Sequence, residues 1–545
     1  MNALFHVPAL GRRNSFILKL ALFSLLIILS GPGFGQKLSW SEILEDPKRE
    51  GWNDNLYEGK YYSYHRADGE FTLIRRDLNM KEEARETFTY KHESAPGKFT
   101  EPRFRWMGDR LVVFTRFKDK DEETFHLYYQ IYDLSTMQTS GPEEFMDIDF
   151  IGKFRYEDIL VKVSPDATKM AISYFTSPER GKFEREDLTH HLKVYNNEMQ
   201  ELYKADLVED DREEHIEINY YTDFSWFSDG RILFLKSRWV GTDEDDEVQE
   251  DVDEDEITPR LFTLIEFDDK GSPLDHQYLE VGQVYVNDIS VLVDENDKVA
   301  IAGVYSKIYS SSMGGVFFAK EGGNGKIGEF EFIHLSEDQV FELTPTKQAD
   351  KIRKKAEKKA AKKGRDVIYE LSNMVWRGFI ERGDDYVYIL EKYRYWQTQS
   401  TDANGNTTTT NHYKYGEIMT WSFSKNMELN WMSRIPKSQY TKNDGGSNSS
   451  FVYGYTDDKM YYIYHDLEEN LKKPKNETIT VNTRKKIPLM LAEVDSEGDF
   501  DRQVIGTEKD TKLDIRPRSG MHIEGDRIIL IARDKLKWTH ASYEF

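Results

Sequence analysis

The segment DFSWFSDGRILFLKSR, residues 223–238, decides the fold. Two arms of apolar and aromatic residues flank the turn Ser228-Asp229-Gly230, and Asp-Gly supplies the positive φ that a tight hairpin requires. Similar hairpins recur at intervals of roughly sixty to eighty residues. A single hairpin cannot bury its apolar faces, whereas stacked copies can, so the repeat predicts a β-propeller. The other turns lie at Gly108-Asp109, Pro165-Asp166, Glu295-Asn296-Asp297, Gly383-Asp384, Asp457-Asp458 and Gly525-Asp526.

A third apolar segment follows most of these hairpins. Arms with continuous apolar character favour strands that are buried on both faces, as between stacked blades. We therefore predict an all-β fold, a propeller of about seven blades with a range of six to eight, formed by a single domain over residues 36–545. The third segments are residues 127–134, 191–197, 260–268, 416–424 and 488–495.

The two ends of the chain are expected to meet. The last hairpin is followed only by THASYEF, residues 539–545, while spare strands lie near Lys60–His65 and Glu70–Asp77. An open ring would leave sheet edges unpaired. We predict that N-terminal strands pair with the C-terminal blade and close the ring.

Residues 1–35 have the pattern of a secretory signal peptide. A basic region with Arg12, Arg13 and Lys19 precedes an apolar core, and Gly33 and Gly35 are the small residues before a cut at Gln36. The core is short for a bilayer span, which favours cleavage, with an uncleaved N-terminal anchor as the alternative. We expect export to the periplasm, the outer membrane or the outside of the cell, with no transmembrane segment after cleavage.

The charge of the chain excludes one class of partner. The formal net charge is −24, and removal of residues 1–35 takes it to −27. So acidic a chain is poorly suited to bind nucleic acid through bulk electrostatics. The chain has no Cys, which excludes disulfides, thiolate catalysis and thiolate zinc sites.

Three polar insertions interrupt the pattern. Residues 243–256 hold eleven acidic residues and no basic one, and we predict a solvated loop rather than a calcium site, because the spacing of calcium ligands is missing. Residues 347–365 hold ten basic residues and favour a solvated helix, with a basic arm for an acidic partner as the alternative. Residues 398–411 are rich in Thr and Asn and are predicted to be a long loop.

Two of the hairpins carry a resemblance. VSPDATKMAIS (163–173) and FSDGRILFL (227–235) resemble the TolB-type propeller repeat, although Ala167 replaces the usual Gly. Residues 416–439 resemble a segment of large, secreted, uncharacterised propeller-like proteins of Bacteroidetes bacteria. The resemblance implies a propeller platform and brings no catalytic residue with it.

Searches for catalytic and metal-binding patterns find no candidate, so no catalytic, cofactor-binding or metal-binding residue is predicted. Residues 445–449 fail as a nucleophile elbow, and His92-Glu93 lacks the second His of a zinc site. His190 and His191 are adjacent on a predicted strand and should point to opposite faces. Four tryptophans could form a sugar-stacking face, although aromatic residues in strands more often pack between blades. They are Trp376, Trp396, Trp421 and Trp431.

The sequence therefore favours a non-enzymatic propeller that acts as a binding or assembly platform at the bacterial envelope. The expected partner is a protein or a glycan, with no cofactor, and the oligomeric state is left open. The alternative is a glycan-acting hydrolase, which needs two carboxylates in a deep central pocket. With 98 acidic residues in the chain, that chemistry can be neither excluded nor located from the sequence.

Overall fold

The structure is a computed structural model of the chain. It describes residues 38–45, 54–67, 70–89, 103–119, 124–149, 160–176, 189–207, 216–240, 260–282, 284–307, 312–322, 325–342, 344, 346–364, 367–401, 406–474, 479–483, 487–506, 513–523, 526–534 and 537–545. The predicted signal peptide and the acidic insertion 243–256 lie outside these residues, as does His92-Glu93.

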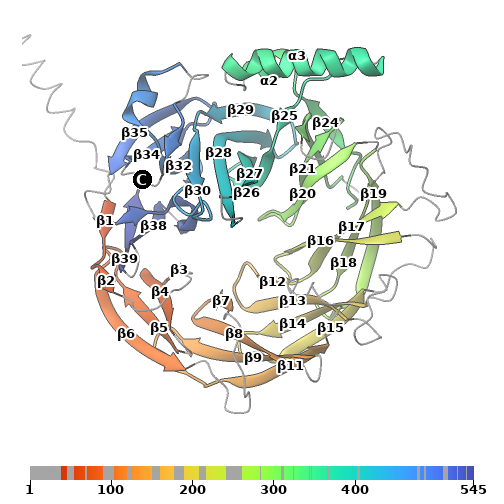
Figure 1. Ribbon diagram of the computed structural model, residues 1–545. Coiled ribbons are helices and arrows are strands. Elements are labelled where there is room, and N and C mark those ends of the chain that lie inside the picture. The colour runs from red at the N-terminus through yellow and green to blue at the C-terminus, as the bar shows by residue number, and fades with distance from the viewer. Residues whose placement is uncertain are drawn as a thin grey trace, which may run out of the picture.

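Within these ranges, strand pairing that is antiparallel except between β30 and β33 builds eight sheets of four to six strands and one two-stranded sheet. The larger sheets follow one another around a ring in chain order, which is the arrangement of a β-propeller (Figure 1). The first four of these sheets lie in the first half of the chain. Their strands are β3 Asp54–Tyr57, β4 Lys60–Ala67, β5 Glu70–Arg76 and β6 Glu82–Thr89; β7 Arg103–Met107, β8 Arg110–Asp119, β9 Thr124–Asp133, β10 Gln138–Thr139 and β11 Glu143–Asp149; β12 Leu160–Val163, β13 Lys169–Thr176, β14 Thr189–Asn196 and β15 Glu201–Leu207; and β16 Ile216–Trp226, β17 Ile232–Val240, β18 Arg260–Phe267 and β19 Pro273–Glu280.

The second half of the chain forms the other four larger sheets and the small sheet of β22 with β25. Its strands are β20 Tyr285–Val293, β21 Val299–Ser306, β23 Gly315–Lys320 and β24 Glu331–His334; β22 Ser312–Met313 and β25 Leu371–Ser372; β26 Met374–Arg382, β27 Asp385–Thr401, β28 Thr407–Ser424, β29 Leu429–Ile435, β30 Gln439–Lys442 and β33 Val481–Asn482; β31 Phe451–Tyr455, β32 Met460–His465, β34 Leu489–Val494 and β35 Phe500–Gly506; and β36 Asp514–Ile515, β37 Met521–Ile523, β38 Arg527–Asp534 and β39 Lys537–Glu544 with β1 Leu38–Trp40 and β2 Leu44–Glu45.

Six of the seven predicted hairpins join the first two strands of a sheet, and the seventh joins β37 to β38, with Gly525 of its turn outside the described residues. The turns need left-handed backbone, and residues at positive φ supply it: Gly230 has φ +92° and Gly383 has φ +53°. Ala167, where the propeller repeat usually has Gly, adopts φ +55° despite its side chain. The five predicted third segments fall in β9, β14, β18, β28 and β34.

Apolar layers fill the spaces between neighbouring sheets. All eight residues of β21 and all six of β32 are buried, which confirms the prediction of strands covered on both faces. One layer joins Ala302 and Phe318 of one sheet to Tyr388, Met419 and Trp421 of the next. This packing of sheet against sheet holds the ring together.

The chain ends meet, but not through the strands that the sequence suggested. β1 pairs with β39, so Leu38 lies opposite Tyr543 and Trp40 opposite Ala541. A hydrogen bond also joins the two ends, because Ser41 Oγ lies 2.9 Å from Thr539 Oγ1. The predicted closing strands near residues 60–65 and 70–77 instead pair with each other in a four-stranded sheet of their own. Both segments are strands as predicted, but the sequence analysis assigned them to the wrong sheet.

Two further predictions concern the insertions. The basic segment forms α3, Thr346–Lys363, which lies with α2, Glu337–Glu342, outside the ring in Figure 1. The side chain of Arg353 stacks over the ring of Phe341 at 4.3 Å. The predicted loop 398–411 is instead largely strand, because β-branched Thr pairs across β27 and β28 as far as Thr401 and Thr407. None of the helices in the described ranges has the length and apolar character needed to cross a membrane. Short 3₁₀ turns are Glu468–Lys472 and Pro517–Ser519.

Candidate functional site

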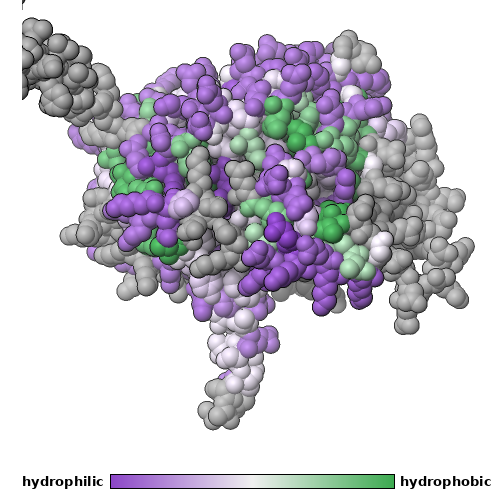
Figure 2. Space-filling view, turned by 90° about the horizontal axis from the view of Figure 1, so that it is seen from above, coloured by the Kyte–Doolittle hydropathy of each residue, from purple (hydrophilic) through white to green (hydrophobic). Residues whose placement is uncertain are grey.

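The longest strands of the molecule extend beyond their sheet. β27 has 17 residues and β28 has 18, and they remain paired from Asp385↔Ser424 to Thr401↔Thr407. β26 accompanies β27 only as far as Lys392, and β30 accompanies β28 only over His412–Tyr415. The remainder projects from the body as the narrow, weakly hydrophilic ribbon at the lower edge of Figure 2. We call residues 393–401 and 406–415 the arm.

Alternation along the strands gives the arm two different faces. Tyr393 stands opposite Tyr415 with ring centroids 4.8 Å apart, and Tyr395 opposite Tyr413 at 5.3 Å. The Tyr395 hydroxyl donates a hydrogen bond to Asn411 Oδ1 at 2.8 Å. The residue Tyr395 is 45% exposed. This tyrosine face ends on Tyr415, which is buried. Burial raises the pKa of Tyr415 to about 12, so its hydroxyl stays protonated.

The opposite face carries a triangular cluster of three flat rings from three strands. Trp396 of β27 stacks on His412 of β28 at 4.8 Å with 4° between the ring planes, and Tyr440 of β30 lies 6.0 Å from each with planes within 20°. The imidazole of His412 is fixed on both sides, since its Nε2 lies 2.7 Å from Thr398 Oγ1 and its Nδ1 lies 2.6 Å from the Tyr440 hydroxyl. These hydrogen bonds hold the rings in one arrangement.

Cations lie over two of these three rings. The guanidinium of Arg394 lies over Trp396 at 5.2 Å, and the ammonium of Lys442 lies over Tyr440 at 5.7 Å. Lys414 stands directly opposite Arg394 in the β27–β28 pair. We call the six residues Arg394, Trp396, His412, Lys414, Tyr440 and Lys442 the cation–aromatic face.

A fully buried ion cluster supports the base of the arm. Glu391 and Lys437 both have side chains with 0% exposure, and their Oε1 and Nζ atoms lie 2.6 Å apart. The guanidinium of Arg377 reaches Glu391 Oε2 at 2.6 Å, and the hydroxyl of Ser450 donates to the same oxygen at 2.7 Å. Burial lowers the pKa of Lys437, and the carboxylate of Glu391 opposes that effect. The cluster therefore holds one carboxylate between two cations.

The segment that delivers Ser450 has an unusual backbone. Asn443 and Ser450 adopt φ +53° and +68°, and Gly446 adopts +71°. A Cβ at Gly446 would lie 2.5 Å from the Tyr415 hydroxyl, so this position requires glycine. The predicted loop 445–449 is thus packed against the arm, with Ser449 buried beside Thr483. Left-handed non-glycine residues beside a buried charge cluster mark a place where the fold accepts local strain.

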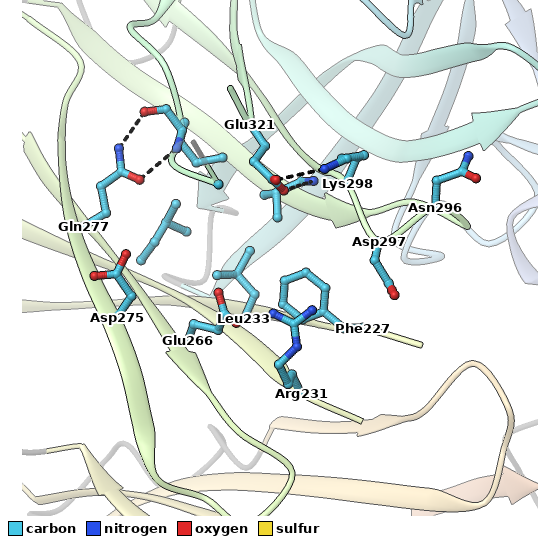
Figure 3. A pocket seen from close by; sticks show the side chains of 14 residues that line it. Phe227, Arg231, Leu233, Glu266, Asp275, Gln277, Asn296, Asp297, Lys298 and Glu321 are labelled. Carbon is cyan, nitrogen blue, oxygen red and sulfur yellow. Dashed lines mark hydrogen bonds and ion pairs between the residues drawn. The ribbon is translucent and has the colours of Figure 1, made fainter. Parts of the chain in front are cut away.

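A polar cavity of about 320 Å³ lies between the β16–β19 and β20–β24 sheets (Figure 3). Arg231 lies over the ring of Phe227 at 4.2 Å and forms ion pairs with Asp229 and Glu266. Gln277 fixes the far wall, because its side-chain amide donates to the Ile327 carbonyl and accepts from the Ile327 amide at 2.6 and 2.8 Å.

The carboxylates of this cavity are all engaged. Asp275 pairs with Lys326 at 3.0 Å, Glu321 pairs with Lys298 at 3.1 Å, and Asp297 accepts two hydrogen bonds from Ser228. The hydrogen bond from Lys326 lowers the pKa of Asp275. A glycosidase acid needs a raised pKa, and the cavity lies between two neighbouring sheets rather than at the centre of the ring. The cavity therefore does not have the features that the hydrolase hypothesis required.

The predicted aromatic candidates separate into two groups. Trp421 and Trp431 are buried in the layers between sheets, as expected of strand aromatics. Trp376 is 38% exposed on β26, and Trp396 stands on the arm. The structure therefore does not bring the four tryptophans together as one sugar-stacking face.

The two adjacent histidines point to opposite faces, as predicted. His190 is buried with its Nε2 2.5 Å from Ser173 Oγ, whereas His191 faces outward with Nδ1 2.7 Å from Asp206. Burial, with the nearby charge of Lys236, lowers the pKa of His190 and keeps it neutral. Over the described residues, no group of three or more His, Asp or Glu side chains could hold a metal ion.

Sequence reasoning missed the residues at the base of the arm. Glu391 interrupts the apolar run YVYILEKY, and a charged residue in a strand covered on both faces needs a buried partner. That signal indicates a buried ion pair. It does not name Lys437, which is 46 residues away in the sequence.

No protein-family model matches the chain, and no curated protein matches it either. Among solved structures, the chain is similar to prolyl oligopeptidase B from Galerina marginata, with 9% identity and a TM-score of 0.39 over 91% of this chain and 56% of that one. It is similar to the β-propeller domain of the Trilobed protease from Pyrococcus furiosus, with 10% identity and a TM-score of 0.35 over 85% and 98%. It is also similar to the polysaccharide lyase Uly1, with 10% identity and a TM-score of 0.34 over 84% and 92%. This chain thus spans only about 56% of the prolyl oligopeptidase, and likeness at these scores carries no argument about activity.

Proposed function

We propose that the chain is an exported, non-enzymatic β-propeller that acts as a binding or assembly platform at the bacterial envelope. We take the eight larger sheets as eight blades, at the upper end of the range six to eight, and propose that the pairing of β1 with β39 closes the ring. The signal-peptide pattern of residues 1–35 supports export to the periplasm, the outer membrane or the outside of the cell. The partner is a protein or a glycan, and no cofactor is involved.

The arm is the observation that carries this proposal. An isolated two-stranded ribbon is only marginally stable in water, so a projecting one needs support from the body. The Glu391 cluster supplies that support, because Arg377, Lys437 and Glu391 tie β26, β27 and the segment just before β30 together. The outer half of the arm is exposed and buries no surface of its own protein, so contact with a partner is the role that we assign to it. A projecting element that the body supports at its base is suited to bind a partner.

Among the residues that the structure describes, the cavity of Figure 3 does not favour the alternative, a glycan-acting hydrolase. Its two carboxylates would have to lie in a deep central pocket, with one of raised pKa. The carboxylates around the cavity of Figure 3 are paired or hydrogen-bonded.

Photo-cross-linking in the native host tests the proposal. A photo-reactive amino acid replaces Gln399 on the exposed arm or, as the control, Leu274, which is 54% exposed on β19. We expect a discrete adduct from position 399 and none from position 274. The absence of any adduct from the arm, or equal adducts from both positions, would contradict the proposal that the arm is the contact element.

A further inference from the structure

The cation–aromatic face breaks a rule of strand pairing. Arg394 and Lys414 stand directly opposite each other, and like charges in that position destabilise a sheet. Burial and the charges of Lys392 and Arg394 lower the pKa of Lys414, while Glu417 acts in the opposite direction. Glu417 itself is engaged, since it pairs with Arg434 at 3.2 Å.

The charges of the face are left unneutralised in a chain with 98 acidic residues. Among the residues that the structure describes, Arg394, Lys414 and Lys442 form no ion pair with a carboxylate. Local rules are typically broken where function requires it. Three such cations around one cluster of rings indicate a site for an external anion.

The rings between the cations indicate what else that anion contains. Trp396, His412 and Tyr440 lie in nearly parallel planes, and hydrogen bonds with Thr398 and Tyr440 fix the two imidazole nitrogens of His412. Trp396 and Tyr440 are partly exposed. Rigid aromatic surface bordered by charged groups suits a ligand that has both a flat apolar face and a carboxylate.

We propose that the cation–aromatic face binds an acidic glycan. The apolar faces of its sugar rings pack against the exposed surface of Trp396 and Tyr440, and its carboxylates pair with Arg394, Lys414 and Lys442. This inference rests on the proposed function of the arm as the contact element, and it names the chemistry of the partner.

Charge density separates an acidic glycan from a nucleic acid. Duplex DNA carries one charge per about 1.7 Å of axis, a higher charge density than that of a polyuronate, so a chain of net charge −24 repels DNA more strongly. A polyuronate carries one carboxylate per sugar, so three local cations suffice for a short stretch. The cation–aromatic face has only three cations, which is enough to pair with the carboxylates of a short polyuronate segment.

Binding to polygalacturonate tests the inference, with neutral dextran as the comparison polymer and affinity electrophoresis in low salt as the assay. We expect the wild type to bind polygalacturonate and not dextran, with binding lost as salt is raised. The Arg394→Gln/Lys414→Gln variant and the Trp396→Ala variant should each weaken binding by about tenfold or more. The double variant removes a like-charge pair, so it should unfold at the same urea concentration as the wild type or a higher one.

Tyr395→Ala is the matched control, because Tyr395 neighbours Trp396 but lies on the opposite face of the arm. Its affinity should stay within about twofold of the wild type. Failure of the wild type to bind polygalacturonate, an equal loss in Tyr395→Ala, or equal binding of single-stranded DNA would overturn the inference. A protein adduct from position 399 without polygalacturonate binding would refute only the glycan and leave the platform standing.

Discussion

The buried cluster under the arm predicts an asymmetry between its two fully buried charges. In Glu391→Gln, the ammonium of Lys437 loses its carboxylate and keeps only Gln439 Oε1 at 3.3 Å. Breaking a buried pair so that one charge remains uncompensated costs about 3–5 kcal/mol. We therefore expect Glu391→Gln to lose about that much free energy of unfolding.

Lys437→Met should cost less, although it breaks the same contact. Glu391 would still accept from Arg377 at 2.6 and 2.8 Å and from Ser450 at 2.7 Å, and Arg377 is in part exposed. The loss is then about 1.5–3 kcal/mol, the value of one hydrogen bond to a charged group. The double variant Glu391→Gln/Lys437→Met leaves no buried lone charge, so it should be more stable than Glu391→Gln alone.

Urea unfolding followed by tryptophan fluorescence measures the four proteins, because Trp421 is buried in the same sheet. The order of midpoints should be wild type, Lys437→Met, the double variant close to it, and Glu391→Gln last. Because the double variant lies close to Lys437→Met, the coupling energy should be about as large as the loss in Glu391→Gln, about 3–5 kcal/mol. Simple addition of the two single losses would refute the reasoning, since it would mean that the two charges do not compensate each other.

Three further expectations follow from other parts of the molecule. Burial raises the pKa of Asp466 to about 6, so the folded state holds this proton more tightly than the unfolded chain and stability falls as pH rises from about 4 to about 6. The free energy of unfolding of Asp466→Asn should therefore rise by roughly 2–3 kcal/mol relative to that of the wild type between pH 4 and pH 7. A difference in urea midpoints that stays constant over this pH range would contradict the raised pKa. Removal of residues 539–545 deletes most of β39 and should lower the melting temperature and promote aggregation, while removal of residues 404–410 from the arm should do neither; equally mild effects would mean that β39 does not close the ring. Deletion of residues 241–256 should leave the melting temperature unchanged, and a calcium-dependent melting temperature that the deletion abolishes would show an ion site there instead.

The sequence by itself determined the repeated unit. Asp-Gly and related turns between short apolar arms, as in residues 223–238, specify hairpins, because turn chemistry and strand alternation are local properties. Continuous apolar arms also predicted that the strands would be covered on both faces, as β21 is. These features depend on a few neighbouring residues and can be read without knowing what lies across the ring.

Tertiary structure alone decided which segments meet. The weakly patterned strands β1 and β2 close the C-terminal sheet, because pairing there depends on which edge is free after the other sheets have formed. The same holds for the arm, where Glu391 meets Lys437 and Trp396 meets Tyr440 only because β30 joins β28. Contacts between distant strands are set by the packing of whole sheets, which no local pattern records.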